Sequence, residues 1–183
     1  MFKLALFTFG VLKGTYNSEA LKYFSGAAPS VFAALDKVDG FIAHASQVRP
    51  DLRGAAGVGE DYGPWGFYAV PRFFDQRWKA EGVGMIQTLS LWRDEKAARE
   101  FSYGGLHRAV LKRRSEWLQH PQWPGYVLWW VSDEVTPTWS DGVRRLEALA
   151  DEGPTASGFD FARFHDEKGH LKPKGKSSNL HVA

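Results

Sequence analysis

A histidine that closely follows two glycines is the residue best placed for chemistry in this 183-residue chain. His107 comes shortly after Gly104 and Gly105, whose missing side chains would let a ligand approach the backbone. Ser102 and Tyr103 lie one turn earlier if the segment is helical, within hydrogen-bonding reach. Such a histidine can act as a general base, or its neutral ring can bind a metal ion such as a haem iron. The more frequent role of a single helical histidine is a structural hydrogen bond.

Cationic side chains follow His107 closely along the chain. They are Arg108, Lys112, Arg113 and Arg114. Arg113 or Arg114 could bind an acidic group of a ligand, such as the propionates of a haem. The alternative is a solvated helix face on which these cations pair with Glu100 and Glu116.

Aromatic side chains are abundant, with eight Trp, and large rings often line a pocket for a flat apolar ligand or a subunit interface. The residues predicted to contact a substrate are Trp92, Trp65, Tyr62, His44 and Trp129. His44 paired with His107 would suit a metal, although no third ligand is evident. Strand alternation places Trp129 and Trp130 on opposite faces of a sheet.

Several function classes lack sequence support. The chain has no phosphate-binding P-loop, no G-x-G-x-x-G, no nucleophile elbow and no H-E-x-x-H. A net charge of +2 argues against nucleic acid as a partner. No run approaches the roughly 18 apolar residues of a membrane span, and cysteine is absent. We therefore predict a cytoplasmic protein without disulfides.

The elements that must position these residues follow from hydrophobic periodicity and turn signals. Strands are predicted at residues 2–12, 41–48, 84–92 and 126–132. Helices are predicted at residues 17–38, in two pieces interrupted at Gly26 and Pro29; at 94–118, capped by Asp94 and weakened at Gly104 and Gly105; and at 138–150. Residues 49–83 form an irregular, aromatic-rich insertion that could serve as a lid.

The order of elements is β-α-β followed by β-α-β, which is typical of a split βαβ, ferredoxin-like α+β domain with a four-stranded antiparallel sheet. An extra C-terminal helix follows. We assign the domain to residues 1–152 and a partly flexible extension to residues 153–183. Because such a sheet has one uncovered face, we also predict a homodimer that buries it as a dimeric α/β-barrel.

The segment SLWRDEKAAREFSYGGLHRAVLKRRSEW, together with the later YVLWWV, resembles the family known as domain of unknown function 3291. The opening LALFTFGVLKG and the GF before the second strand resemble it too. That family is similar to the dimeric α/β-barrel superfamily, which includes small monooxygenases and haem proteins. The central segment is more loosely similar to spheroidene monooxygenase, a haem-containing carotenoid oxygenase. The matching positions are Ser90, Leu91, Trp92, Phe101, Tyr103, His107, Arg113 and Arg114.

These resemblances imply a monooxygenase-like enzyme of secondary metabolism that acts on an apolar or aromatic small molecule. In this hypothesis His107 binds haem or acts as a base, Tyr103 and Arg113 take part in catalysis, and Arg114 contacts the cofactor. A version without any cofactor would rely on an electron-rich substrate to activate oxygen. The alternative hypothesis is a non-catalytic dimer that binds a hydrophobic ligand.

Overall fold

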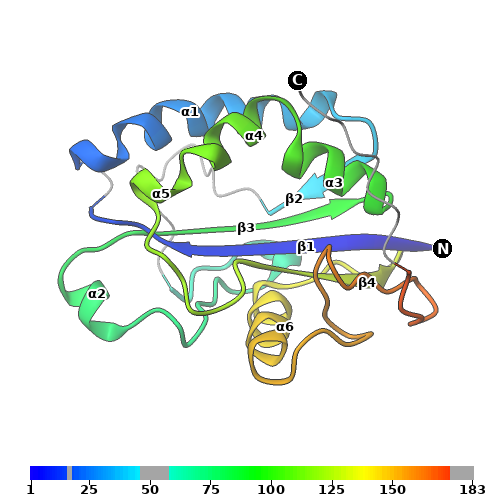
Figure 1. Ribbon diagram of the computed structural model, residues 1–183. Helices are drawn as coiled ribbons and strands as arrows, with labels where there is room; N and C mark the ends of the chain where they lie inside the picture. Colours follow the sequence, from blue (N-terminus) through cyan, green and yellow to red (C-terminus); the bar gives the residue numbers. More distant parts are fainter. Residues whose placement is uncertain (16–17, 46–57, 174–183) are drawn as a thin grey trace.

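A single antiparallel sheet organises the computed structural model, which describes residues 1–15, 18–45 and 58–173 (Figure 1). Its strands are β1 (Phe2–Val11), β2 (Phe41–His44), β3 (Met85–Trp92) and β4 (Tyr126–Ser132). They pair in the order β2-β3-β1-β4. The predicted α+β, split βαβ arrangement with a four-stranded antiparallel sheet is confirmed. The predicted residues 46–48 of the second strand lie outside the described ranges.

Four helices cover one face of this sheet (Figure 1). They are α1 (Lys22–Ala33), α3 (Glu95–Tyr103), α4 (Gly105–Lys112) and α5 (Arg114–Trp117). Two 3₁₀ turns, at Glu19–Leu21 and Leu35–Lys37, flank α1. None of the helices within the described ranges is long and apolar enough to cross a membrane.

The first helix is continuous, and the predicted break at Gly26 and Pro29 is wrong. Pro29 lies inside α1 and on its solvent-exposed side. Proline fixes a backbone φ that a helix accepts, and it removes one hydrogen bond, to the carbonyl four residues earlier. Because this side of α1 faces water, the unbonded carbonyl of Ser25 can bond to solvent instead.

The second helical stretch divides where its glycines predicted. Asp94 caps α3 by accepting a hydrogen bond from the amide of Ala97 (2.9 Å), and α3 ends at Tyr103. A Cβ atom at Gly104 would lie 2.3 Å from the carbonyl oxygen of Glu100, so only glycine fits here. Gly105 adopts a positive φ of 46°, which glycine accepts without steric cost. The chain therefore turns at these two residues and presents the first turn of α4, which carries His107.

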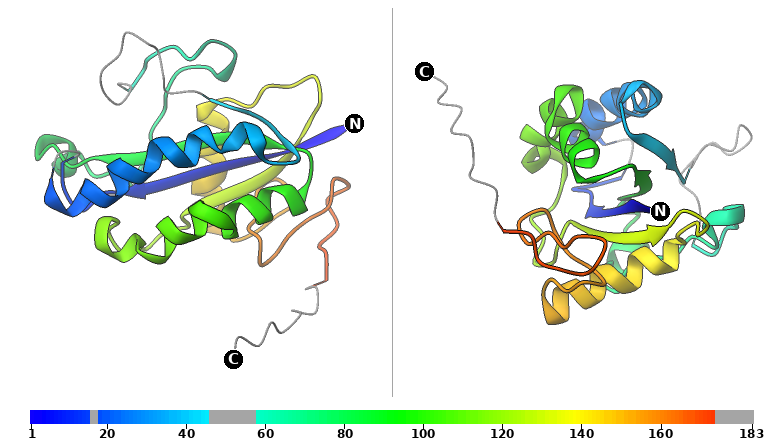
Figure 2. Two further views of the ribbon diagram at one scale, coloured as in Figure 1. Left: turned by 90° about the horizontal axis from the view of Figure 1, so that it is seen from above. Right: turned by 90° about the vertical axis from the view of Figure 1, so that its right-hand side faces the viewer.

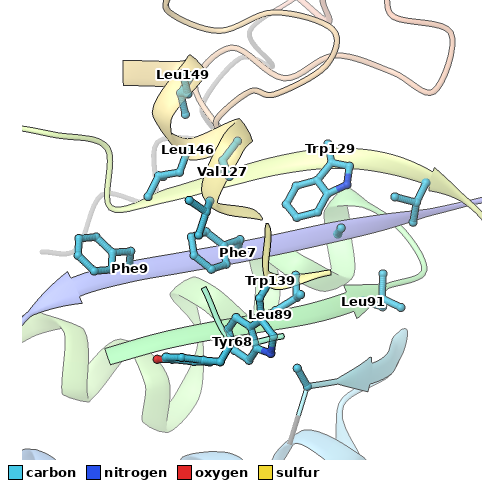
Figure 3. Close-up of a cluster of buried hydrophobic side chains, with 14 of the residues drawn as sticks. Phe7, Phe9, Tyr68, Leu89, Leu91, Val127, Trp129, Trp139, Leu146 and Leu149 are labelled. Carbon is cyan, nitrogen blue, oxygen red and sulfur yellow. The ribbon is translucent and has the colours of Figure 1, made fainter. Parts of the chain in front are cut away.

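The other face of the sheet is covered by the same chain, contrary to the prediction that it is open. Helix α6 (Trp139–Glu152) and residues 58–83 pack on it and form a large aromatic and aliphatic core (Figure 3). Within this segment lie a 3₁₀ turn at Gly63–Trp65 and the short α2 (Gln76–Ala80). The predicted C-terminal helix is confirmed, and a Thr138–Asp141 capping box begins it. The sheet face that motivated a dimer is thus buried within one chain.

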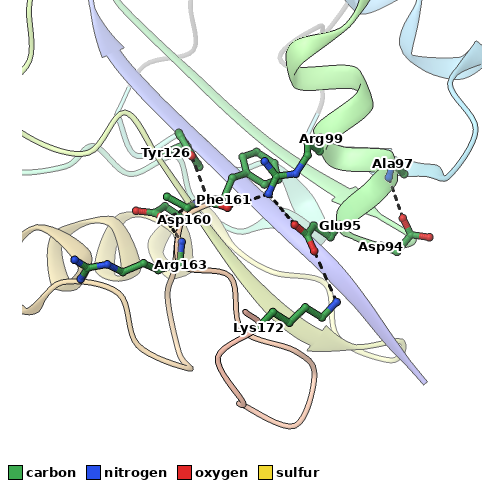
Figure 4. Close-up of polar contacts among 10 residues, drawn as sticks. Asp94, Glu95, Ala97, Arg99, Tyr126, Asp160, Phe161, Arg163 and Lys172 are labelled. Carbon is green, nitrogen blue, oxygen red and sulfur yellow. Dashed lines mark hydrogen bonds and ion pairs between the residues drawn. The ribbon is translucent and has the colours of Figure 1, made fainter. Parts of the chain in front are cut away.

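Residues after α6 contribute to the core on the helix-bearing face (Figures 2 and 4). Phe159 is fully buried and pairs with Leu128 through two backbone hydrogen bonds of 2.8 and 2.9 Å. Phe161 and Phe164 join the same cluster. The predicted extension therefore begins with a segment that closes the outer edge of β4.

Candidate functional site

An apolar pocket of about 220 Å³ lies between α1 and the junction of α3 with α4. Its walls are Val31, Ala34, Val38, Glu100, Phe101, Gly104, Gly105, Leu106 and His107. Leu106 is among the exposed large apolar side chains, so the pocket reaches the surface beside it. Within the described part of the chain, the ionisable side chains that line it are those of His107 and Glu100. The glycine turn between α3 and α4 thus forms part of the wall of a small apolar pocket.

The hydrogen bond of His107 fixes which ring nitrogen carries the proton. Its Nδ1 atom lies 2.8 Å from the carbonyl oxygen of Ser102. A carbonyl oxygen only accepts hydrogen bonds, so Nδ1–H is the donor, and the neutral ring keeps its lone pair on Nε2. The ring stacks on Phe101, with centroids 4.9 Å apart, which holds its plane. Orientation by a backbone carbonyl is the arrangement that a histidine base or metal ligand requires.

Burial keeps the imidazole of His107 neutral. Desolvation lowers its pKa below the ordinary value of 6.5, and the hydrogen bond to Ser102 opposes this to a smaller extent. At neutral pH the side chain is therefore a hydrogen-bond acceptor at Nε2.

The cations predicted to bind an acidic group do not line this pocket. Arg113 forms an ion pair with Glu116 (2.7 Å) and lies over the ring of Tyr23, 3.7 Å from its centroid. Arg114 donates to the carbonyl of Leu111. The charged group among the lining residues is instead Glu100, which pairs with Lys96 at 3.8 Å.

Trp92 lies behind the pocket wall, and His44 lies beside it. Trp92 is fully buried and packs against Phe101, with ring centroids 5.1 Å apart. Its indole N–H donates to the hydroxyl of Ser90 (2.9 Å). His44 packs against Phe41, which in turn meets Trp92. These rings support the pocket from the sheet side and are not among its lining residues.

Three predicted substrate contacts lie on the opposite face of the sheet. Trp129 is 1% exposed within the α6-side core, and Tyr62 and Trp65 pack against that core. Tyr62 meets Trp139 edge to face, with centroids 5.6 Å apart. The sheet therefore separates these three residues from His107.

Tyr103 also points away from the His107 pocket. Its ring contacts Phe161 from the C-terminal segment, at 5.6 Å between centroids, and its hydroxyl interacts with that of Tyr126. Tyr103 and His107, which were predicted to act together, therefore lie apart: Tyr103 contacts the C-terminal segment, whereas His107 lines the pocket beside α1.

The sequence indicated no role in a pocket for the lining residues Val31, Ala34, Val38 and Leu106. Apolar residues on one side of a helix usually belong to a core. A pocket forms where the facing element leaves space beside such residues. Gly104 and Gly105, which lack side chains, were the feature of the sequence that indicated this space.

The pocket residues do not fit a haem. Its volume lies below the range of about 300–1,000 Å³ typical of drug-sized ligands, and a haem requires more space than such ligands. Its charged lining residue is an acid, which would repel the propionates. In the described ranges no three His, Cys, Asp or Glu side chains are grouped as a metal site. We therefore assign no step to haem.

Fold and pocket define a ferredoxin-like α+β protein with an apolar pocket among its helices. The chain belongs to the family described as "Domain of unknown function (DUF3291)", whose model matches residues 3–175. A crystal structure of NE2512, a protein of unknown function from Nitrosomonas europaea, is similar at 15% identity and a TM-score of 0.40. The similarity covers 74% of this chain and 93% of that one. No curated protein matches the chain, and the similarity to spheroidene monooxygenase stays a prediction.

Proposed function

We propose that this protein is a monooxygenase-like enzyme that binds a small, uncharged aromatic hydroxyl compound in the His107 pocket. The observation that carries the proposal is the Nδ1–H bond to Ser102, which leaves Nε2 of a neutral, half-buried ring as an acceptor beside apolar walls. A phenol offers the complementary features, namely an apolar ring and one hydroxyl donor.

His107 would act as a general base on the bound hydroxyl. Transfer of the phenol proton to Nε2 gives an imidazolium and an electron-rich phenolate. Oxidation of a phenol by O₂ to a quinone and water balances without another reductant, because the substrate supplies all four electrons. This is the cofactor-free form of the predicted reaction, and it suits a pocket that does not fit haem.

A coloured phenol tests the acceptor at Nε2. Because the pKa of His107 is lowered, we expect 4-nitrophenol to bind as the neutral phenol, with its absorbance band shifted to longer wavelength by the hydrogen bond that its hydroxyl donates to Nε2. The control ligand 4-nitroanisole has a similar shape but no proton to donate, and should bind more weakly. His107→Phe keeps an aromatic ring and should abolish the colour change. Equal binding of both ligands would contradict the role of His107.

Oxygen uptake with 1-naphthol tests the reaction. We expect one O₂ consumed per 1,4-naphthoquinone formed, and loss of this activity in His107→Phe. Binding without oxygen uptake would support the alternative, a non-catalytic ligand-binding protein.

Two further predictions concern the cytoplasmic location and the homodimer. We keep the cytoplasmic location as a proposal, because the chain has no cysteine. The homodimer is not carried further, since the face expected to form it is covered by α6 and residues 58–83.

A further inference from the structure

A column of four rings runs from the sheet to the wall of the pocket and ends at His107. Phe41 on β2 meets Trp92 on β3 edge to face, with ring centroids 5.4 Å apart. Trp92 in turn packs on Phe101 of α3 at 5.1 Å, and Phe101 packs on His107 of α4 at 4.9 Å. The last two pairs have interplanar angles of 30° and 29°, so each ring offers mainly its face to the next. The column therefore connects two strands with the two helices that meet at the pocket (Figure 1).

The backbone of the sheet holds the base of this column. Trp92 is fully buried, and its indole N–H donates to the hydroxyl of Ser90 (2.9 Å). The Ser90 hydroxyl has one hydrogen, which it donates to the carbonyl of Leu6 on β1 (3.4 Å). Because an indole has a single N–H, its bond to Ser90 fixes the direction of the ring as well as its position. The indole of Trp92 is therefore a rigid support behind Phe101.

The imidazole of His107 needs such a support. The hydrogen bond from its Nδ1 to the carbonyl of Ser102 constrains one atom and leaves the ring free to tilt about the direction of that bond. The face of Phe101 removes this freedom on one side. Phe101 and Ser102 are consecutive residues near the end of α3, so one helix end supplies both constraints. Together they decide where the Nε2 lone pair points.

We infer that Phe101 and, behind it, Trp92 are positioning residues for His107. Phe101 fixes the plane of the imidazole, and Trp92 keeps the ring of Phe101 in place. Both act through the direction and the tautomer of the imidazole. The inference rests on the proposed function for its effect on phenol binding, but not for its effect on the ring of His107.

The ring nitrogens of His107 report its tautomer without any ligand. In protein labelled with ¹⁵N-histidine, protonated and unprotonated ring nitrogens give well-separated signals, and those of His107 are the ones missing from His107→Phe. At about pH 8 we expect the wild type to show a proton on Nδ1 and a lone pair on Nε2. In Phe101→Leu the two signals should move toward each other, because the ring then exchanges between both neutral tautomers.

Trp92→Phe tests the second step of the column. The smaller ring has no N–H to bond to Ser90, so Phe101 loses its support, and the His107 signals should move in the same direction by a smaller amount. In the double variant with Phe101→Leu, the change should equal that of Phe101→Leu alone, because Trp92 acts through Phe101. If Trp92→Phe does not fold, Ser90→Ala replaces it, since that change keeps the indole and removes the acceptor that fixes it.

Two control variants separate positioning from a general loss of packing. Phe164→Leu removes a buried ring of the same core cluster, whose partners are Phe159 and Trp130, and should leave the His107 signals unchanged. Phe101→Tyr keeps an aromatic face and should retain the wild-type signals. The affinity for 4-nitrophenol should follow the tautomer, and be about three- to tenfold weaker in Phe101→Leu and nearly unchanged in Phe101→Tyr.

Unchanged His107 signals in Phe101→Leu would overturn the inference, and so would an equal change in Phe164→Leu. Additive changes in the double variant, or no change in Trp92→Phe, would overturn the role of Trp92. Wild-type protein that carries the proton on Nδ1 but binds no phenol would refute the proposed function and leave the positioning of His107 intact.

Discussion

Gly142 on α6 lies directly against the ring of Phe7 on β1. A Cβ atom at position 142 would lie 2.5 Å from Cδ2 of Phe7, closer than real side chains approach. Phe7 is fully buried at the centre of the α6-side core, so its ring has no free space to move into. This contact is how α6 comes close enough to seal the sheet face that would otherwise be open (Figure 3).

Gly142→Ala should therefore destabilise the protein by about 1–3 kcal/mol through overpacking. The matched control is Gly26→Ala in α1, where an added Cβ meets nothing within 4 Å. That change should stabilise the protein by about 0.5–1 kcal/mol, because alanine favours a helix over glycine. Urea unfolding of both variants measures the two effects, and destabilisation of equal size would refute the close contact.

The pH dependence of stability should contain a contribution from His107. Its pKa is lower in the folded chain than the ordinary 6.5, so the unfolded chain binds more protons as the pH falls through that value. The contribution of His107 to stability is therefore fully present above about pH 7. It decreases as the pH falls through 6.5 and levels off below the pKa of His107 in the folded chain. Thermal melts of wild type and His107→Gln between pH 8 and pH 5 should show a smaller decrease in the variant. Identical profiles would mean that His107 is not desolvated.

Ser90 should matter for stability through Trp92. Its hydroxyl accepts the buried indole N–H of Trp92, and Ser90→Ala would leave that donor without a partner. The expected loss is about 1–3 kcal/mol of unfolding free energy. Ser115→Ala, at an exposed position of α5, is the control and should change stability by less than about 0.5 kcal/mol.

The first part of the C-terminal extension should be essential to the fold. Phe159→Ala removes a fully buried ring and should cost about 3–5 kcal/mol, whereas Phe67→Ala, at a position 63% exposed, should cost much less. Chemical denaturation compares the two. If Phe159→Ala unfolds the protein entirely, Phe159→Leu should retain a folded state with intermediate stability.

Addition of haemin should produce no Soret band that depends on His107. We expect the same spectrum with wild type and His107→Ala, because the pocket is small and its charged lining residue is an acid. A band present in wild type and lost in the variant would show that the pocket opens to accept haem.

The sequence by itself determined the strands, the cap at Asp94 and the break between α3 and α4. Those features depend on local causes: alternation, a carboxylate before a helix, and two adjacent glycines. Asp94 caps α3 as its position predicts, and the chain turns at Gly104 and Gly105. It also drew attention to His107, which lies in the wall of the pocket.

Only the tertiary structure decided which side chains meet. Trp129, Tyr62 and Trp65 appeared to be companions of His107, yet the sheet lies between them, because α6 and residues 58–83 cover the second face. Likewise, the hydroxyls of Thr8 and Thr88 meet only through strand register, which brings together residues far apart in the chain. Pairing across strands and packing between layers are non-local, and a single sequence does not record them.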